Sequence, residues 1–203
     1  MTTIPKETHA YELRIELDGI KPPIWRSVAV PSGITLDRLH DVIQIAMGWL
    51  DCHAHLFDFR GRRFSEDPAE GGVDDQDEAQ IRLCDVIQEE GERFVYTYDF
   101  GDDWRHSVTL TRIVAIPDGH IMRLQCGDGQ RARPPEDVGG LPGFQRFREA
   151  MKDKNHPEHE RLKEWHGGRF QPNRFRIDEV NDELAKYTRW SRNRSLPWPS
   201  KVE

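Results

Sequence analysis

Hydrophobic and polar residues alternate along two early segments of the chain. From Tyr11 to Leu17 every second residue is apolar, which places the apolar side chains on one face of a β-strand and leaves the other face in water. After a turn at Asp18-Gly19, a second strand is predicted over residues 24–30. The two segments therefore predict an antiparallel pair of strands.

The period changes to that of an α-helix after the second strand. Apolar residues recur at helical spacing from Leu36 to Met47. Thr35 is a suitable N-cap residue, and Gly48 is a suitable stop because glycine adopts the left-handed conformation that often follows a helix. His40 shares the apolar stripe, so we expect it to be a packed core histidine.

Alternation returns in the middle of the chain. Residues 93–99 and 104–114 are rich in β-branched and aromatic residues. The turn-forming sequence Phe100-Gly-Asp-Asp103 separates them, so the two segments predict a β-hairpin. A further strand is expected near residues 120–126.

The other segments predict loops and short helices. Residues 65–79 contain seven Asp and Glu residues and two adjacent glycines, which is typical of a solvated loop. Residues 127–143 are rich in proline and glycine and predict an irregular backbone. Three short helices are expected near the C-terminus, over residues 144–152, 157–165 and 178–187.

These elements indicate an α+β fold. Strands joined by hairpins predict a mainly antiparallel or mixed sheet, with one long helix after the second strand and several short C-terminal helices. A chain of 203 residues is long enough for one sizeable core. We therefore expect a single domain over residues 1–188 and a loose tail over residues 189–203, which contain two prolines and several arginines.

Composition narrows the classes of function. No segment approaches the roughly 20 apolar residues that a membrane helix needs, and the N-terminus lacks the apolar core of a signal peptide, so we expect a cytoplasmic protein. The net charge of −7 disfavours binding to a phosphate backbone. Basic and aromatic residues do interleave at Trp25-Arg26 and Trp104-Arg105, which keeps a local contact with nucleic acid open as an alternative.

The cysteines indicate free thiols. Cys52, Cys84 and Cys126 are an odd number and have no CxxC spacing, which argues against a disulfide framework and a structural zinc knuckle.

The turn of the predicted hairpin is the first candidate for chemistry. Together with Asp99 just before it, the turn contains three carboxylates, although one aspartate and a glycine suffice for a turn. Crowded carboxylates repel one another unless a cation compensates. Asp99, Asp102 and His106 are therefore candidate ligands of Mg²⁺ or Mn²⁺. The structural alternative is an ordinary turn beside a buried His106, with Asp99 as the natural partner of its imidazole.

Two further segments have residues suited to a binding site. His53 and His55 are two residues apart, so on a strand both would point to one face. Glu136 and Asp137 stand between two prolines and two glycines, which favours a rigid loop along a pocket; alternatively, they cap the helix that follows. The sequence thus predicts a polar, aromatic-lined cleft made of Trp49, His53, His55, Asp99, Asp102, Asp103, Trp104, His106, Glu136 and Asp137.

Several motifs, in order and spacing, resemble the Ri-plasmid open-reading-frame-three-like family. They include Pro22-Pro-Ile-Trp-Arg26, Tyr96-Thr-Tyr-Asp-Phe-Gly-Asp-Asp-Trp-Arg-His106, Pro134-Pro-Glu-Asp-Val-Gly-Gly140 and Phe170-Gln-Pro-Asn-Arg-Phe175, and the resemblance covers residues 10–187. It implies a prokaryotic α+β domain often encoded on plasmids or mobile elements, with members also labelled insertion-element passenger or TnpR-like proteins. It implies no reaction. Arg133 departs from the small residue or cysteine expected before Pro134, which puts in doubt any thiolate site shared with Cys126.

Two functions remain after this comparison. The first is a non-catalytic accessory domain whose cleft binds a protein or small-molecule partner. The second is a divalent-metal-dependent hydrolase acting on phosphodiesters, which requires at least three of the cleft side chains within about 5 Å of a common point. The residue patterns of serine and tyrosine recombinases are absent from the sequence.

Overall fold

A computed structural model of the chain describes residues 9–68, 75–117, 120 and 122–190. The strands, in chain order, are β1 (His9–Leu17), β2 (Ile24–Pro31), β3 (His55–Phe59), β4 (Arg62–Ser65), β5 (Gln76–Asp77), β6 (Arg93–Tyr98), β7 (Trp104–Ala115) and β8 (Gln125–Gln130). The helices are α1 (Leu36–Met47), α2 (Gly140–Lys152), α3 (His159–Trp165) and α4 (Ile177–Trp190), and single 3₁₀ turns span Glu78–Gln80 and Leu83–Asp85.

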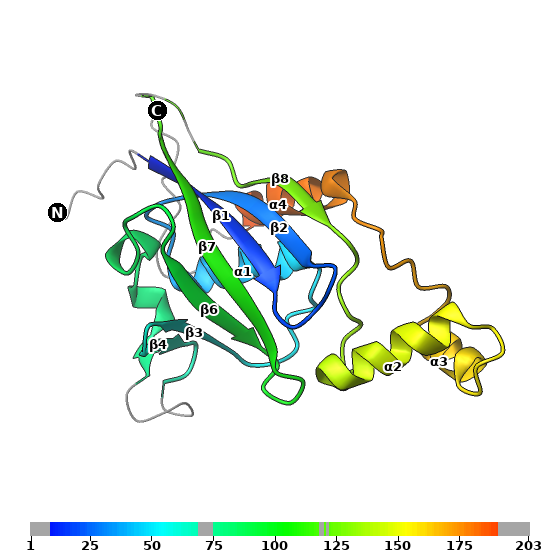
Figure 1. The fold of residues 1–203 in the computed structure, drawn as a ribbon. Helices are drawn as coiled ribbons and strands as arrows, with labels where there is room; N and C mark the ends of the chain where they lie inside the picture. The colour runs from blue at the N-terminus through cyan, green and yellow to red at the C-terminus, as the bar shows by residue number, and fades with distance from the viewer. Residues whose placement is uncertain (1–8, 69–74, 118–119, 121, 191–203) are drawn as a thin grey trace.

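The described strands form one mixed sheet in the order β5-β4-β3-β6-β7-β1-β2-β8 (Figure 1). β4 and β5 pair in parallel, and the other neighbouring strands are antiparallel. The predicted β1–β2 pair and the β6–β7 hairpin are confirmed. The fold is α+β with a mainly antiparallel sheet, as the hydrophobic pattern indicates.

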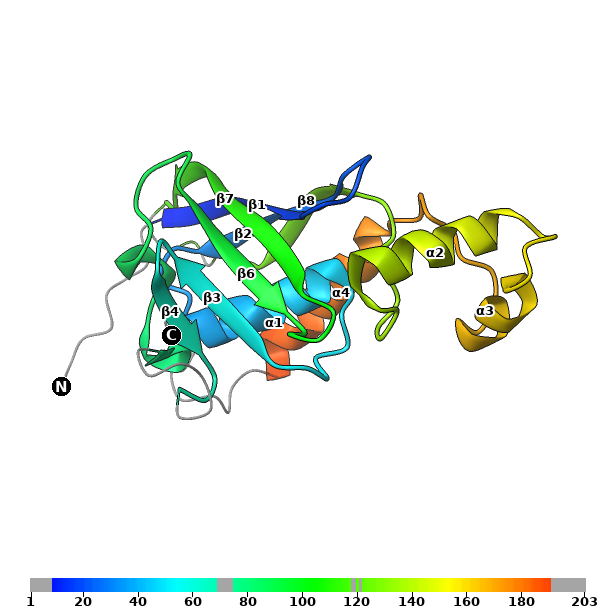
Figure 2. The ribbon, with the colours of Figure 1, turned by 60° about the horizontal axis from the view of Figure 1, so that its bottom comes forward.

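α1 is enclosed by the rest of the molecule. The sheet curves over one side of this helix, and α4 runs beside it (Figure 2). Every residue of α1 except Ile45 is buried, including several polar ones. Leu36, Leu39 and Ile43 are fully buried in the core against the sheet. Because water does not reach the polar side chains of α1, they need partners within the protein.

The bounds of α1 agree with the prediction. Thr35 occupies the N-cap position, although its hydroxyl donates to the Asp37 carboxylate and accepts no capping bond from a backbone N–H of the helix. Gly48 ends the helix with φ = 89°, and its N–H donates to the Gln44 carbonyl at 2.8 Å. A β-carbon at this left-handed position would strain the backbone, which is why glycine suits it.

α2 and α3 extend away from the sheet at one end of the molecule (Figure 1). Their shared core is aromatic. Phe144 and Phe147 are buried on one face of α2, and the Phe147 ring packs edge-on against Trp165 of α3, with 5.9 Å between ring centroids.

Two predictions for the C-terminal half require correction. The strand expected near residues 120–126 is β8, which starts later and continues to Gln130 through residues predicted to be irregular. The irregular segment also ends early, since α2 begins at Gly140. Cys126 explains the placement of β8: its side chain is fully buried, and β8 pairs with β2 around a bulge at Ser27 and Val28.

Other sequence predictions can be compared with the described residues. The three C-terminal helices exist with shifted ends, and α4 continues to Trp190. The predicted contrast between one long helix and several short ones is wrong, because α2 and α4 have 13 and 14 residues and α1 has 12. Residues 191–203 lie outside the described residues, so the loose tail stays a prediction. No helix in the described segments is long and apolar enough to cross a membrane. All three cysteines are free.

Replacing Leu39 with alanine should lower the free energy of unfolding by about 2–5 kcal/mol, because a fully buried leucine leaves a cavity when it is truncated. Urea unfolding followed by tryptophan fluorescence measures the change. Ile45→Ala on the partly exposed side of the same helix is the control and should cost less. Equal losses in the two variants would contradict the enclosed position of α1.

Candidate functional site

Three loops from distant parts of the sequence meet at one end of α1. The Leu50 N–H, after α1, donates to Glu136 Oε1 at 2.7 Å. The Gly139 N–H donates to Asp102 Oδ2 at 3.1 Å. A β-carbon at Gly140 would lie 2.7 Å from the Asp102 carbonyl oxygen, so only glycine allows this close approach. The loops around residues 50, 102 and 136–140 are therefore held together by direct contacts.

His53 lies where these loops meet. Its Nε2 is 3.2 Å from Asp137 Oδ1 and 3.7 Å from Asp99 Oδ2. This nitrogen is shielded from solvent, yet it has no hydrogen-bond partner in the described part of the chain, and the same is true of Glu136 Oε2. Cys52 and Glu136 flank the imidazole, each with a potential ligand atom within 4.8 Å of it.

The aspartates of these loops share an uncommon backbone conformation. Asp51, Asp99, Asp103 and Asp137 have φ angles of 53°, 56°, 52° and 54°. Aspartate tolerates this left-handed region because its short side chain can bond to the nearby backbone. Asp99 does so, since its Oδ1 accepts from the Gly101 N–H at 2.9 Å. The turn thereby fixes the Asp99 carboxylate toward His53.

Aromatic rings lie beneath the loops. Trp49 stacks on Trp104 with 5.7 Å between ring centroids, and the Arg133 guanidinium lies 4.8 Å from the centroid of the Trp49 ring. Tyr98 supports the loop from below, because its hydroxyl accepts from the Cys52 N–H at 3.1 Å. Burial raises the pKa of Tyr98 well above its usual value, so the hydroxyl stays protonated.

His106 does not have the environment predicted for it. Its Nε2 accepts from Trp49 Nε1 at 3.2 Å, and its Nδ1 lies 3.2 Å from the Tyr96 carbonyl oxygen. The expected partner Asp99 is therefore wrong, because both ring nitrogens bond elsewhere. Burial lowers the pKa of His106 to about 4, so the ring is neutral near pH 7.

The predicted trio of metal ligands is not brought together. Asp99 lies beside His53, while the Asp102 carboxylate accepts from the backbone of another loop. His106 has no free nitrogen. Asp103 is exposed at the tip of the turn. Asp99, Asp102 and His106 thus have separate roles, two in holding the fold and one at the site.

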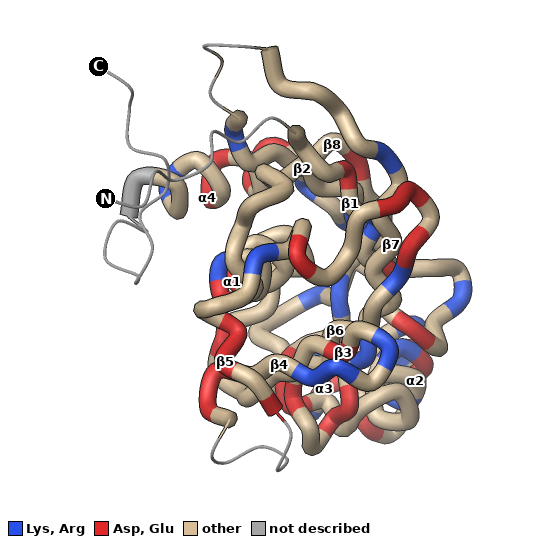
Figure 3. Tube along the Cα trace, turned by 90° about the vertical axis from the view of Figure 1, so that its left-hand side faces the viewer, with Lys and Arg blue, Asp and Glu red and all other residues tan. Residues whose placement is uncertain are grey.

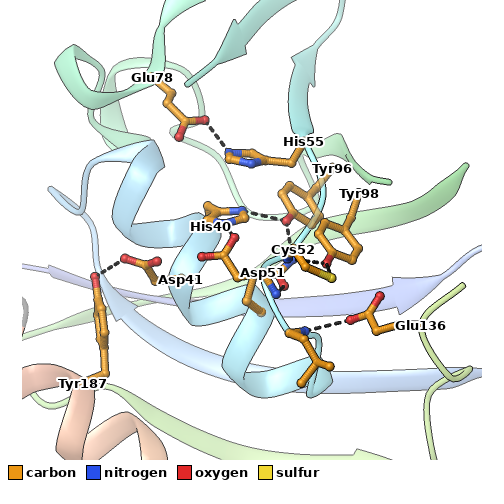
Figure 4. Close-up of polar contacts among 12 residues, drawn as sticks. His40, Asp41, Asp51, Cys52, His55, Glu78, Tyr96, Tyr98, Glu136 and Tyr187 are labelled. Atoms are coloured by element: carbon orange, nitrogen blue, oxygen red, sulfur yellow. Dashed lines mark hydrogen bonds and ion pairs between the residues drawn. The ribbon is translucent and has the colours of Figure 1, made fainter. Parts of the chain in front are cut away.

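His55 belongs to a second, buried network of polar side chains (Figure 4). Its Nε2 lies 2.9 Å from Glu78 Oε2, and its ring stacks on His40 at 3.6 Å between centroids. His40 in turn contacts the Tyr96 hydroxyl through Nδ1 and Asp51 Oδ1 through Nε2, both at 2.8 Å. His40 is thus buried, as predicted, with both nitrogens partnered.

Glu78 overturns part of the loop prediction. Residues 65–79 were expected to be solvated, but Glu78 is 2% exposed and pairs with His55. A buried carboxylate without a partner is costly, so the imidazole is what allows Glu78 to be inside.

A groove of about 790 Å³ lies next to the His53 loops. Its walls come from the C-terminal end of α1, the loop over residues 132–137, and residues 165–183. The lining includes Arg26, Arg133, Arg169, Arg174 and Arg176. Elsewhere the charges are mixed: in the view of Figure 3, basic and acidic positions are interspersed along the chain, with acidic ones gathered around β5.

The sequence pattern did not single out Cys52, Arg133 and Glu78 as members of these sites. Cys52 adjoins His53, so its position was the one available signal. Arg133 stands out in the sequence only because it departs from the residue expected before the Pro134–Gly140 motif. Glu78 had no local signal, because its burial depends on a partner 23 residues away in the chain.

A family profile and two similar proteins each match most of this chain. The profile of the plasmid pRiA4b ORF-3-like protein family matches residues 9–179. The uncharacterised protein y4hQ of Sinorhizobium fredii (strain NBRC 101917 / NGR234) is 36% identical over 185 residues, which cover 89% of this chain and 93% of that protein. The crystal structure of MM3350, a protein of unknown function from Methanosarcina mazei Go1, superposes with a TM-score of 0.77 at 33% identity, covering 86% of this chain and 99% of the other. The chain therefore belongs to the plasmid pRiA4b ORF-3-like family.

Replacing Glu78 with alanine should destabilise the protein by about 3–5 kcal/mol, because it removes one partner of a buried pair. Glu78→Gln retains a hydrogen-bonding group and should cost less. Urea unfolding at pH 7 measures both, with the exposed Glu89→Ala as the control. A loss from Glu78→Ala no larger than that from Glu89→Ala would show that the pair contributes nothing.

His106 should make the protein sensitive to acid. Between pH 6.5 and about 4 the unfolded chain binds a proton at His106 that the folded protein does not, so stability falls as the pH falls. The stability advantage of wild type over His106→Gln should therefore shrink by about 3 kcal/mol from pH 7 to pH 4. Urea unfolding of both proteins across this range measures it, and parallel pH profiles would refute the buried neutral imidazole.

Proposed function

We propose that this member of the family is a non-catalytic binding module that holds a small organic anion with an aromatic body in the groove beside Arg133. The observation that carries the proposal is a pair of guanidinium groups along the groove, from the buried Arg26 and the half-buried Arg133. Among the described residues, neither has a carboxylate within ion-pair distance. A buried cation without an anion favours an anionic ligand.

Arg26 is a fixed positive charge in the floor of the groove. It is 3% exposed, and carbonyl oxygens satisfy its donors: Ala46 at 2.9 Å, Trp25 at 2.7 Å, Gln130 at 2.8 Å and Arg131 at 2.9 Å. Burial lowers the pKa of Arg26 to about 10, which leaves it charged near pH 7. Carbonyl dipoles hold the group in place but do not cancel its charge.

Arg133 holds the second positive charge nearer the His53 loops. Its Nε donates to the Gly48 carbonyl and its NH1 to the Pro134 carbonyl at 2.6 Å, so the end of α1 and the loop fix its orientation. Burial lowers its pKa, and the nearby charge of Glu136 acts in the opposite direction. A pre-oriented guanidinium loses little entropy when it binds a carboxylate or a phosphate.

The rest of the groove suits a ligand with an apolar body. Its volume lies within the range of about 300–1,000 Å³ that is typical of small-molecule sites. Trp165, Phe170 and Phe175 line it. Glu136, Asp137, Glu179 and Glu183 line it as well, and these carboxylates disfavour an extended phosphate backbone. A compact anion with a ring fits this combination better than a nucleic acid.

The second function considered from the sequence, a metal-dependent phosphodiester hydrolase, is less well supported. Its predicted ligands Asp99, Asp102 and His106 do not point to a common ion, since His106 uses both nitrogens within the core. We therefore place no reaction at this cluster.

Calorimetric titration with benzoate, adenosine monophosphate, citrate and inorganic phosphate tests the proposal. We expect benzoate or adenosine monophosphate to bind more tightly than inorganic phosphate. Arg133→Gln should weaken that binding about tenfold or more, because a hydrogen bond to a charged group is worth about 1.5–3 kcal/mol.

Two further variants control the experiment. Arg174→Gln changes the opposite wall of the groove and should also weaken binding, without disturbing the carbonyl contacts of Arg133. Arg161→Gln removes an exposed arginine that does not line the groove and should bind as wild type does. Absence of binding by all four anions, or unchanged affinity in both groove variants, would overturn the proposal.

A further inference from the structure

A second site lies around His53, next to Asp137 of the loop over residues 132–137. It combines one imidazole nitrogen with carboxylate oxygens from Asp99 and Asp137, and these three ligand atoms all lie within 4.8 Å of one another. They come from three different loops, so the fold and not the local sequence brings them together. This cluster differs from the trio of metal ligands predicted from the sequence, Asp99, Asp102 and His106. The two sets share only Asp99.

The distances match those around a single ion. Bonds of roughly 2.0–2.2 Å to a tetrahedral metal place neighbouring ligand atoms roughly 3.3–3.6 Å apart. His53 Nε2 lies 3.2 Å from Asp137 Oδ1 and 3.7 Å from Asp99 Oδ2. Both separations from the imidazole nitrogen therefore lie within a few tenths of an ångström of those expected around one ion, and the two carboxylate oxygens lie within 4.8 Å of each other.

Direct hydrogen bonding does not explain the cluster. Two carboxylate oxygens surround His53 Nε2, yet in the described part of the chain neither has hydrogen-bond geometry with it. Ligands of one ion have this relation, because each directs its lone pair at the metal and not at its neighbour. Two carboxylates facing one nitrogen also repel each other unless a cation lies between them.

The site has one closed side and one open side. The Asp99 side chain is 9% exposed, and its other oxygen is held by the backbone of the turn. The Asp137 side chain is 71% exposed, so an ion can enter from that side. Cys52 and Glu136 stand beside the three ligands but have other contacts, Cys52 Sγ with the Tyr98 hydroxyl and Glu136 Oε1 with the Leu50 N–H.

We infer that His53, Asp99 and Asp137 bind one divalent transition-metal ion of the Zn²⁺ class. An imidazole nitrogen beside two carboxylates suits Zn²⁺ better than Mg²⁺, which prefers oxygen ligands in an octahedral arrangement. Zn²⁺ also binds such mixed sites more tightly than Mn²⁺ does. Three protein ligands leave the fourth tetrahedral position open. This inference goes beyond the proposed anion binding and does not depend on it.

Titration of chelator-treated full-length protein with Zn²⁺ under a phosphine reductant tests the inference, with calorimetry for affinity and metal analysis after dialysis for stoichiometry. We expect one Zn²⁺ per chain. His53→Ala and Asp137→Asn should each weaken binding about 100-fold, because the loss of an outer-shell partner alone costs 10–100-fold. Mg²⁺ at the same concentration should not bind.

Two matched variants separate this site from other sources of binding. Asp103→Asn makes the same change at an aspartate with a similar φ angle in the same turn as Asp99 and should leave the affinity within twofold of wild type. Cys52→Ser removes the exposed thiol and should retain binding. Arg174→Gln should also retain it, which distinguishes failure of this site from failure of the groove. Loss of Zn²⁺ binding in Cys52→Ser, or undiminished binding in His53→Ala, would overturn the inference.

Discussion

The enclosure of α1 between the curved sheet and α4 is the constraint on which the rest of the structure depends. A helix with water on one side can leave its polar residues exposed, but α1 has no such side beyond Ile45. Its polar residues therefore need internal partners. Gln44 donates to the Tyr96 hydroxyl at 2.8 Å, and Asp41 accepts from the Tyr187 hydroxyl of α4 at 2.7 Å (Figure 4). These bonds cross from the helix to the sheet and to α4, and so they fix its rotation as well as its position.

Gln44 also determines where the functional loops begin. Gln44 Oε1 accepts from the Asp51 N–H at 3.0 Å, and the Gln44 carbonyl accepts from the Trp49 N–H at 2.9 Å. The chain after α1 is thereby folded back on the helix end. His53 follows two residues later and meets the hairpin turn and the loop before α2. Gln44, which is buried in the core, thus positions the partly exposed His53 without contacting it.

Much of the fold could be predicted from the sequence, because its strands and first helix have strong periodicity and clear end signals. The extent of β8 could not, since its glycines are poor strand formers and the strand continues through them to Gln130. Gly129 is required there for a different reason: a β-carbon would lie 2.8 Å from the side chains of Arg26 and Phe175. The alternation of apolar and polar residues correctly places the His106 ring on the buried face of its strand. The hydrogen-bond partner of that ring, Trp49, comes from a loop 57 residues away in the chain. Local patterns indicate which face a residue occupies; they do not indicate which distant donor it meets.

One short loop connects the two candidate sites. Pro134 and Pro135 stiffen it, and Gly139 and Gly140 allow it to press against the hairpin turn. The loop contributes two carboxylates. Glu136 and Asp137 line the groove with Arg133, and Asp137 also faces His53. An anion in the groove and a cation at His53 would both lie near the Asp137 carboxylate, which lines the groove and faces His53. Charges of opposite sign held this close attract each other, so each ligand would favour the other, and by linkage the effect is reciprocal.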